Sequence, residues 1–231
     1  MQEESKLVKY PRTMHLPWSP GLQNDDRVIE DLSVLESCDD VVVTEKMDGE
    51  NTTLYCDTAH ARSLTSGPHP SRAKVKELWQ SLRWDIPPGM RICGENMYAK
   101  HSIYYDSLRS YFLVFNIWLG DVCLSWEDTI LWCGLLGLDT VPVLYRGKWN
   151  ESVWSDPYHA ERWIRQGRDD HDGGSEREGF VVRLAEEIRL DDFGRSVAKY
   201  VRKGHVQTDE HWMSQEITPN KLSANVDKDI Y

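Results

Sequence analysis

Hydrophobic residues along the chain occur in short runs that are more typical of strands than of helices. Strands are predicted at residues 41–44, 51–55, 59–63, 90–97, 111–118, 122–124, 141–145, 179–184 and 197–201. Apolar positions at helical spacing predict helices at residues 25–36, 71–84, 126–136, 158–166 and 209–215. Helices and strands alternate without the regular spacing of a parallel sheet. The pattern therefore predicts an α+β fold with mainly antiparallel strands.

One stretch places a reactive group where a predicted strand ends. Residues 41–44 and 51–55 flank a short polar turn that contains Gly49, and so they predict a hairpin with Lys46 near the reversal. A single amine could be exposed to a substrate at this position. A bare Lys-x-Asp-Gly tetrapeptide is weak support for such a role, because short motifs arise by chance and the lysine can simply be solvated.

The start of the chain is rich in proline. This density of proline excludes a regular helix, so residues 1–24 are predicted to form an extended strap. Two roles are open for the strap. Arg12, Thr13 and His15 could approach bound phosphates or RNA, or the strap could serve only to cover one face of a sheet.

Length and charge limit the possible functions. At 231 residues the chain can bury a substantial core, and we expect a single domain over residues 1–231, with residues 204–231 as a short tail. The 27 Lys and Arg against 38 Asp and Glu give a net charge of −11. This acidity argues against loose binding of nucleic acid over the whole surface, but it allows a local basic groove. Residues 189–205 are the most basic stretch.

Other charged segments favour simple interpretations. Arg72, Lys74 and Lys76 lie on the predicted helix at residues 71–84, where a solvated face is favoured over an RNA contact. Residues 167–177 contain aspartates and glycines, and solvated carboxylates are favoured there over a metal site. Five cysteines without a C-x-x-C pair predict reduced thiols in a cytoplasmic protein. No apolar leader or bilayer-length run is present, so we expect no membrane association.

Five short motifs follow one another along the chain. They are Lys46-Met47-Asp48-Gly49-Glu50-Asn51, Gly94-Glu95-Asn96, Phe112-Leu113-Val114-Phe115-Asn116-Ile117, Glu178-Gly179-Phe180-Val181-Val182-Arg183 and Lys199-Tyr200-Val201-Arg202. Their order resembles that in the covalent nucleotidyltransferases, the superfamily of ATP-dependent ligases and messenger-RNA capping enzymes. The resemblance covers about residues 40–205. Asn51 stands where RNA ligases carry Asn and where DNA ligases and capping enzymes usually carry Arg. The resemblance is therefore to the ATP-dependent RNA ligase family.

The resemblance implies a role for each motif residue. Lys46 and Lys199 are the implied catalytic residues, and Lys46 would attack the α-phosphate of ATP to form lysyl-AMP. For this attack the amine must be neutral, and we expect Lys199 and a bound metal to lower its pKa. The implied nucleotide-binding residues are Glu45, Asn51, Arg62, Glu95, Phe115, Glu178, Lys199 and Arg202.

Several of these roles are specific. Glu95 would accept a hydrogen bond from the ribose, Phe115 would stack on adenine, and Glu45 would contact the adenine amino group. Glu178 would hold Mg²⁺ or Mn²⁺ as a hard oxygen ligand. Many relatives show Lys-x-Lys in the last motif, whereas Val201 stands here at the third position, so either Arg202 or Lys203 would be the second cation.

The resemblance also implies a fold and partners. We expect a nucleotidyltransferase fold, in which helices flank two mainly antiparallel sheets and the nucleotide lies between the sheets. DNA ligases and capping enzymes add an OB-fold, but 231 − 203 = 28 residues follow the last motif here, so no C-terminal OB-fold is expected. The expected partners are RNA ends, and a partner subunit could replace the missing domain.

The implied function is ATP-dependent RNA ligation for RNA repair. Lys46 is adenylylated, AMP moves to an RNA 5′-phosphate, and a 3′-hydroxyl then displaces AMP. A GTP-dependent capping-type guanylyltransferase and a minimal DNA ligase are alternatives that Asn51 and the missing OB-fold disfavour. A non-catalytic nucleotide-binding module is a third alternative, which the joint presence of Lys46, Glu95, Glu178 and Lys199 disfavours.

Overall fold

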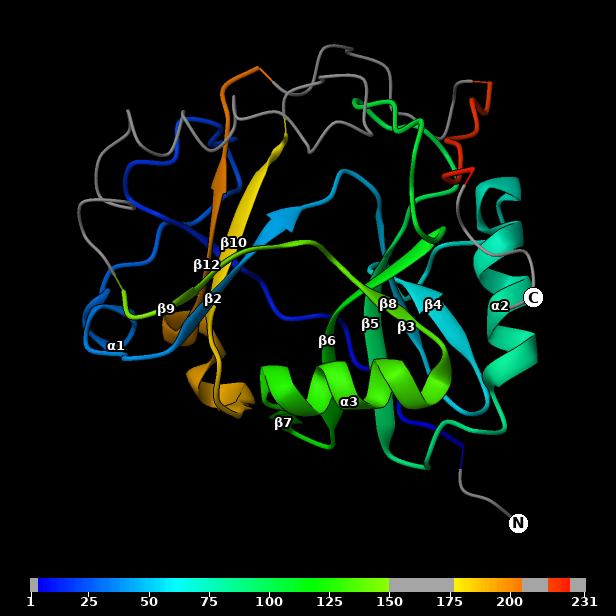
Figure 1. The fold of residues 1–231 in the computed structure, drawn as a ribbon, viewed down its shortest axis with the longest axis horizontal. Helices are drawn as coiled ribbons and strands as arrows, with labels where there is room; N and C mark the ends of the chain where they lie inside the picture. Colours follow the sequence, from blue (N-terminus) through cyan, green and yellow to red (C-terminus); the bar gives the residue numbers. More distant parts are fainter. Residues whose placement is uncertain (1–3, 150–176, 205–215, 225–231) are drawn as a thin grey trace.

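The computed structural model describes residues 4–149, 177–204 and 216–224. Two sheets form its body (Figure 1). Sheet A contains β1 (Met14–His15), β2 (Val41–Lys46), β9 (Val143–Gly147), β10 (Gly179–Leu184) and β12 (Val197–Val201). Sheet B contains β3 (Glu50–Leu54), β4 (Ala59–Ala61), β5 (Met90–Asn96), β6 (Phe112–Leu119), β7 (Val122–Cys123), β8 (Asp139–Thr140) and β11 (Ile188–Arg189).

The strand orders confirm the predicted α+β class. Sheet A has the order β1-β12-β10-β2-β9, and sheet B has the order β11-β7-β6-β5-β3-β4, with β8 paired to β6. Among the described strand pairs, β1 with β12 and β6 with β8 are parallel, and the others are antiparallel. The predicted strands match these elements to within about two residues at most ends.

Helices flank the sheets. They are α1 (Ser33–Glu36), α2 (Ala73–Leu82), α3 (Trp126–Leu136) and α6 (Phe193–Ser196), with 3-10 turns η1 (Pro70–Arg72) and η2 (Leu190–Asp192). In Figure 1, α3 crosses the lower part of sheet B and α2 stands at the outer side of that sheet. Ser125 caps α3 by accepting a hydrogen bond from the Asp128 N–H at 3.0 Å. Gly137 ends α3 with a φ of 65°. These end signals explain why the prediction for residues 126–136 is confirmed.

Two local predictions are wrong. The predicted hairpin does not form, because β2 belongs to sheet A and β3 to sheet B. The helix predicted at residues 25–36 is helical over Ser33–Glu36 alone. Ile29 instead donates its N–H to the His15 carbonyl at 2.8 Å, so the first half of that segment lies extended beside β1. The helices predicted at residues 158–166 and 209–215 lie outside the described residues, as does nearly all of the loop at residues 167–177.

The hydrophobic core has separate clusters on the faces of the sheets. Leu16, Val43 and Phe180 belong to a cluster on one face of sheet A. On the other face of sheet A, Val42 belongs to a cluster with Met97, which follows β5, and with residues of sheet B. A third cluster lies between sheet B and helices α2 and α3. No helix in the described ranges has the length and apolar character needed to cross a membrane.

Candidate active site

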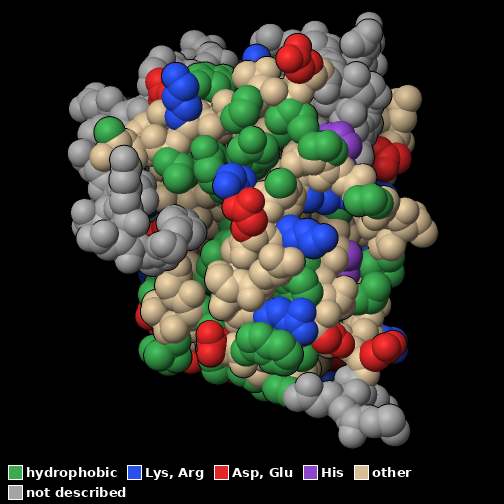
Figure 2. Space-filling view, turned by 90° about the vertical axis from the view of Figure 1, so that its right-hand side faces the viewer, with side chains coloured by type: hydrophobic (Ala, Val, Ile, Leu, Met, Phe, Trp, Pro, Cys, Tyr) green, Lys and Arg blue, Asp and Glu red, His purple; other side chains and the backbone are tan. Residues whose placement is uncertain are grey.

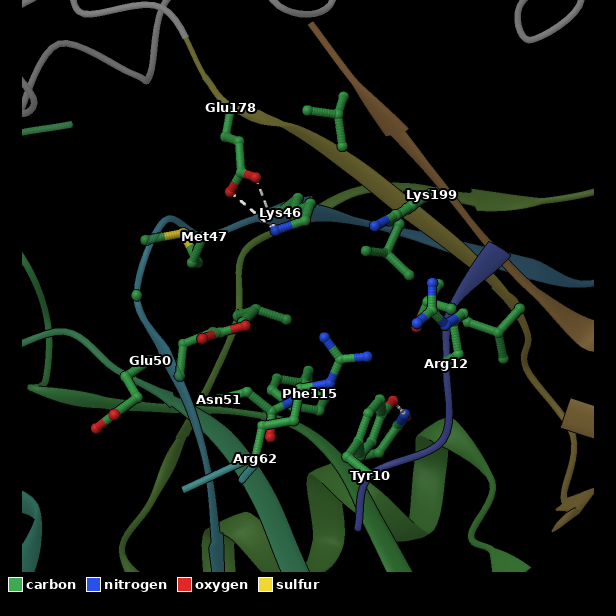
Figure 3. Close-up of a pocket in the computed structure, with 18 of the residues that line it drawn as sticks. Tyr10, Arg12, Lys46, Met47, Glu50, Asn51, Arg62, Phe115, Glu178 and Lys199 are labelled. Atoms are coloured by element: carbon green, nitrogen blue, oxygen red, sulfur yellow. Dashed lines mark hydrogen bonds and ion pairs between the residues drawn. The ribbon is translucent and has the colours of Figure 1, made fainter. Parts of the chain in front are cut away.

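A pocket of about 610 Å³ lies between the sheets. Strands of both sheets and the N-terminal strap contribute to its lining (Figure 3). The predicted site residues that line it are Glu45, Lys46, Asn51, Arg62, Glu95, Phe115, Glu178 and Lys199. The volume lies within the range of small-molecule and cofactor sites.

Lys46 is the last residue of β2, and the chain crosses from sheet A to sheet B directly after it. Asp48 anchors this crossing, because its Oδ2 accepts hydrogen bonds from the N–H groups of Ser102 and Ile103, each at 2.7 Å. Gly49 permits a close approach to β5. A Cβ at this position would lie 2.8 Å from the Asn96 carbonyl oxygen. The Asp-Gly pair after Lys46 therefore holds the crossing in place.

The ammonium of Lys46 forms an ion pair with Glu178. Its Nζ lies 2.8 Å from Oε1 and 2.9 Å from Oε2 of a carboxylate whose side chain is 6% exposed. Burial lowers the pKa of Lys46, but the carboxylates of Glu178 and Glu95 together raise it by more. The net result is a pKa above that of an ordinary lysine. The expected lowering of this pKa includes a bound metal, and it stays a prediction for the metal-bound protein.

Two neighbouring acceptors in the pocket have no hydrogen-bond partner among the described residues. They are Oδ1 of Asn51 and Oε2 of Glu95, and both atoms are buried. Asn51 on β3 lies opposite Glu95 on β5, so sheet B places them side by side. Burial raises the pKa of Glu95 from 4.5 to about 8, while the charge of Lys46 lowers it. These atoms are suited to accept hydrogen bonds from hydroxyl or amino groups of a ligand.

Phe115 and Arg62 lie across the pocket from Lys46 (Figure 3). Phe115 is half-buried on β6, and Tyr10 of the strap contacts its ring edge-on at a centroid distance of 5.2 Å. The Phe115 ring is thus fixed, and part of it remains accessible for stacking. Arg62 follows β4, and no described carboxylate lies within ion-pair distance of it. It is available for an anion.

Lys199 belongs to a second charged group in the pocket. Its Nζ lies 3.2 Å from Oδ1 of Asp26, and Nε2 of His15 lies 3.1 Å from Oδ2 of the same carboxylate. Ser19 contacts the other side of the imidazole, at 2.8 Å from Nδ1. Burial and the nearby Lys46 lower the pKa of Lys199. Burial and Lys199 lower the pKa of His15 to about 4, so its ring is neutral at physiological pH.

Two predicted residues have partners at the edge of this arrangement. Glu45 lines the pocket and lies opposite Phe180 across the β2–β10 pair. Its carboxylate accepts a hydrogen bond from Arg177 Nε at 3.1 Å. Contact of Glu45 with adenine stays a prediction. Arg202 donates from Nε to the Arg177 carbonyl at 2.9 Å and does not line the pocket.

Sequence reasoning missed some residues of the site. Tyr10, Asp26, Arg72 and His101 line the pocket. Arg72 forms an ion pair with Glu50 of the first motif, at 2.5 Å. No motif marks these residues. Arg72 ends η1, and its ion pair shows that the prediction of a solvated side chain is wrong for this residue. Both roles left open for the strap are compatible with the structure, since β1 pairs with β12 while Arg12, Thr13 and His15 line the pocket.

The donor set fits a hard divalent cation that is bound partly by its substrate. The described residues contain no group of three or more His, Cys, Asp or Glu side chains that could hold a metal. Glu178 nevertheless supplies carboxylate oxygens to the lining of the pocket. Mg²⁺ is commonly held by one or two carboxylates together with substrate phosphates.

Comparisons with known proteins agree with this fold. An archaeal ATP-dependent RNA ligase (form 2) matches with a TM-score of 0.56 and 19% identity, over 84% of this chain and 48% of that chain. Form 1 of an archaeal ATP-dependent RNA ligase matches with a TM-score of 0.53 and 16% identity, over 85% and 48%. A putative ATP-dependent DNA ligase from Aquifex aeolicus matches with a TM-score of 0.50 and 19% identity, over 85% and 50%. Among curated proteins, none matches the chain.

These matches define a ligase-type nucleotidyltransferase fold, as the sequence motifs predict. Residues 39–201 match the RNA ligase family, and this chain belongs to that family. The chain spans about half the length of the solved structures that it matches.

Proposed function

We propose that this protein is an ATP-dependent RNA ligase that uses Lys46 as its nucleophile. The observation that carries the proposal is the ion pair between Lys46 and Glu178, located in a pocket with two unpartnered buried acceptors and an accessible aromatic ring. The ATP dependence of the archaeal RNA ligases that share this fold supports ATP as the donor.

In the first step the neutral amine of Lys46 attacks the α-phosphorus of ATP. A nitrogen–phosphorus bond forms, the bond from that phosphorus to the bridging oxygen breaks, and pyrophosphate leaves with the bonding electrons. Lys46 must first lose a proton, and Glu178 is the carboxylate that contacts its ammonium. In the second step the 5′-phosphate of RNA displaces Lys46 and takes AMP. In the third step a 3′-hydroxyl displaces AMP and joins the ends.

The other residues would bind and orient the nucleotide. Lys199 and Arg62 are cations that suit the phosphates. Phe115 suits the adenine ring, and Glu95 and Asn51 suit donors on the ribose. Glu45, which pairs with Arg177, suits the amino group of adenine.

We further propose that Glu178 holds Mg²⁺ or Mn²⁺ together with the phosphates of ATP. The metal, when bound, would supply positive charge that withdraws Glu178 from Lys46 and lowers the pKa of the amine. Without it, the ion pair favours the protonated amine.

Three wider features belong to the same proposal. The strap and the sheets act as one domain, which the pairing of β1 with β12 supports. Five free cysteines favour a cytoplasmic location. RNA ends are the substrate, and a partner subunit could add contacts to them. Sealing of RNA by the purified chain alone would make such a subunit unnecessary.

The direct test is to incubate the protein with ATP and Mg²⁺ and to determine its intact mass. We expect an increase by one AMP that maps to Lys46, and its loss in Lys46→Ala. The matched control is Lys148→Ala, which removes an exposed lysine at the far end of sheet A. A wild-type protein without the adduct, or an adduct that persists in Lys46→Ala, would contradict the proposal. Sealing assays on RNA and DNA nicks then distinguish an RNA ligase from a DNA ligase.

A further inference from the structure

One edge of sheet B carries cations and aromatic rings that, apart from Arg62, do not line the nucleotide pocket. On the face that Figure 2 shows, Lys and Arg side chains are interspersed with Asp, Glu and hydrophobic side chains. Trp84 follows α2 and is 77% exposed. This is the highest exposure among the large hydrophobic side chains of the described residues. A single exposed apolar residue is normal in a soluble protein, so the groups around Trp84 decide its meaning.

Arg83 connects Trp84 to the body of the protein. Its guanidinium carbon lies 4.3 Å from the ring centroid of Trp84 and 4.9 Å from that of Trp79. The Nε of Arg83 is buried without a hydrogen-bond partner among the described residues. The cation–π contacts therefore hold the Trp84 ring beside a positive charge. Because Trp84 is mostly exposed, much of its indole surface remains available for stacking.

Lys76 extends this positive charge along α2. Lys76 and Arg83 are seven residues apart, which is about two helical turns, so they lie on the same side of the helix. Lys76 is exposed, and within the described ranges no carboxylate pairs with it. Lys74 differs, because its Nζ lies 2.8 Å from the Glu77 carboxylate. Lys76 is therefore available to a polyanion, and Arg83, whose charge also acts on the Asp57 carboxylate, lies on the same side at the end of α2.

The same edge continues to the nucleotide pocket. Arg62 lines the pocket and directly follows β4, which is the edge strand of sheet B. On β4, the ring of His60 lies 5.6 Å from that of Tyr55. The Tyr55 carbonyl accepts a hydrogen bond from Nε1 of Trp79 at 2.7 Å, and Trp79 in turn contacts Arg83. The buried Tyr55 and its contacts thus connect β4, which ends next to Arg62, with Trp79 and Arg83 beside Trp84.

We propose that this edge, formed by Arg62, His60, Lys76, Arg83 and Trp84, is a docking track for a single RNA strand whose end enters the pocket. Trp84 stacks on an unpaired base, and Lys76 and Arg83 contact phosphates. A single strand is favoured over a duplex, because bases in a duplex are already stacked and paired. The track rests on the proposed function and deepens it. It also replaces the solvated-face interpretation of Lys76.

The track is tested first by binding. A 5′-phosphorylated single-stranded RNA of about 12 nucleotides, within the usual site sizes, carries a 3′ fluorophore for anisotropy. Trp84→Ala should raise the Kd about 5- to 100-fold, the range that corresponds to loss of one stacked base. Lys76→Glu should also weaken binding and should reduce its salt dependence. Two control variants should have a Kd within about twofold of the wild-type value. Trp84→Phe keeps an aromatic ring, and Lys148→Glu makes the same charge change as Lys76→Glu, but beside sheet A.

The chemical steps separate the track from the proposed function. Formation of lysyl-AMP needs no RNA, so Trp84→Ala should leave it unchanged and should slow AMP transfer to RNA at low RNA concentration. Binding of a blunt RNA duplex should be insensitive to Trp84→Ala. The proposed track is wrong if Trp84→Ala and Lys76→Glu bind the single strand as tightly as their control variants do. It is also wrong if Trp84→Ala weakens binding of the duplex as much as binding of the single strand. A wild type that forms no lysyl-AMP overturns the proposed function, while the anisotropy result still decides the track.

Discussion

Both carboxylate oxygens of Glu178 lie within hydrogen-bond distance of the Lys46 ammonium, at 2.8 and 2.9 Å. The contact follows from strand pairing, because Lys46 ends β2 opposite Gly179, the residue after Glu178. A protonated amine has no lone pair with which to attack phosphorus. The ion pair therefore describes the protein without nucleotide, and in the proposed reaction it must be broken before Lys46 attacks.

Glu178→Gln should make Lys46 more reactive toward a general amine reagent. The amide keeps a hydrogen-bond acceptor but removes the negative charge that raises the pKa of Lys46. Without nucleotide or metal, labelling of Lys46 at pH 8 should be about five- to tenfold faster than in the wild type. Peptide mass spectrometry measures the rate, with the exposed Lys148 as the internal reference. Adenylylation by ATP should fall in the same variant, because a metal ligand is lost.

The opposite result would be informative. If Lys46 is labelled at the wild-type rate in Glu178→Gln, the carboxylate does not control the protonation of the amine. The role proposed for Glu178 would then be reduced to holding the metal.

Glu95→Gln should change the dependence of stability on pH. Burial raises the pKa of Glu95 to about 8 in the folded protein, above its ordinary value of 4.5. The folded state therefore favours the neutral acid. The protonated Glu95 side chain adds its full contribution to the free energy of unfolding below about pH 4.5. This contribution is lost as the pH rises toward 8. Glutamine cannot ionise, so the variant should gain about 1–3 kcal/mol relative to the wild type between pH 5 and pH 8.

Urea unfolding at these two pH values, without nucleotide or metal, measures the gain. The matched control is Glu77→Gln, which removes an exposed carboxylate that pairs with Lys74 on the surface of α2. If the difference in unfolding free energy between Glu95→Gln and the wild type does not grow from pH 5 to pH 8, Glu95 is charged over that whole range.

The strands and the motif order could be predicted from the sequence, because apolar runs and turn residues are local signals. The hairpin around Gly49 could not be excluded in this way. A polar stretch with glycine has the same sequence features whether the chain reverses within one sheet or crosses to another sheet. In the structure Gly49 does not have a positive φ, whereas the commonest tight hairpin turns require one. Gly49 serves a close approach to Asn96 instead.

The ion pair of Glu45 could not be predicted from the sequence. Arg177 lies 132 residues further along the chain, yet its Nε contacts the Glu45 carboxylate at 3.1 Å. Asp26 lies just after the strap, in the part of the segment 25–36 that is not helical as predicted. Its contact with Lys199 depends on how the strap packs against β12, which the sequence does not reveal.

Asp48→Ala should destabilise the protein and impair Lys46 indirectly. The variant leaves the N–H groups of Ser102 and Ile103 without their charged acceptor, at a cost of about 2–3 kcal/mol. Asp48→Asn keeps an acceptor and should lose less. Unfolding by urea gives the stability, and the rate of lysyl-AMP formation reports the effect on Lys46. Equal stability of Asp48→Ala and the wild type would show that the crossing does not depend on these hydrogen bonds.

Asp26→Asn tests the positioning of Lys199. Asp26 raises the pKa of Lys199, whereas burial and Lys46 lower it. Removing this negative charge should lower the pKa of Lys199 further, so the alkaline fall in the rate of lysyl-AMP formation should begin at a lower pH. We expect a severalfold lower rate at pH 9 and a smaller effect at pH 7. Asp25→Asn is the matched control, because the Asp25 side chain is 82% exposed and contacts Arg12 instead of Lys199. A uniform loss of rate at every pH would indicate a structural role for Asp26 and contradict control of the charge on Lys199.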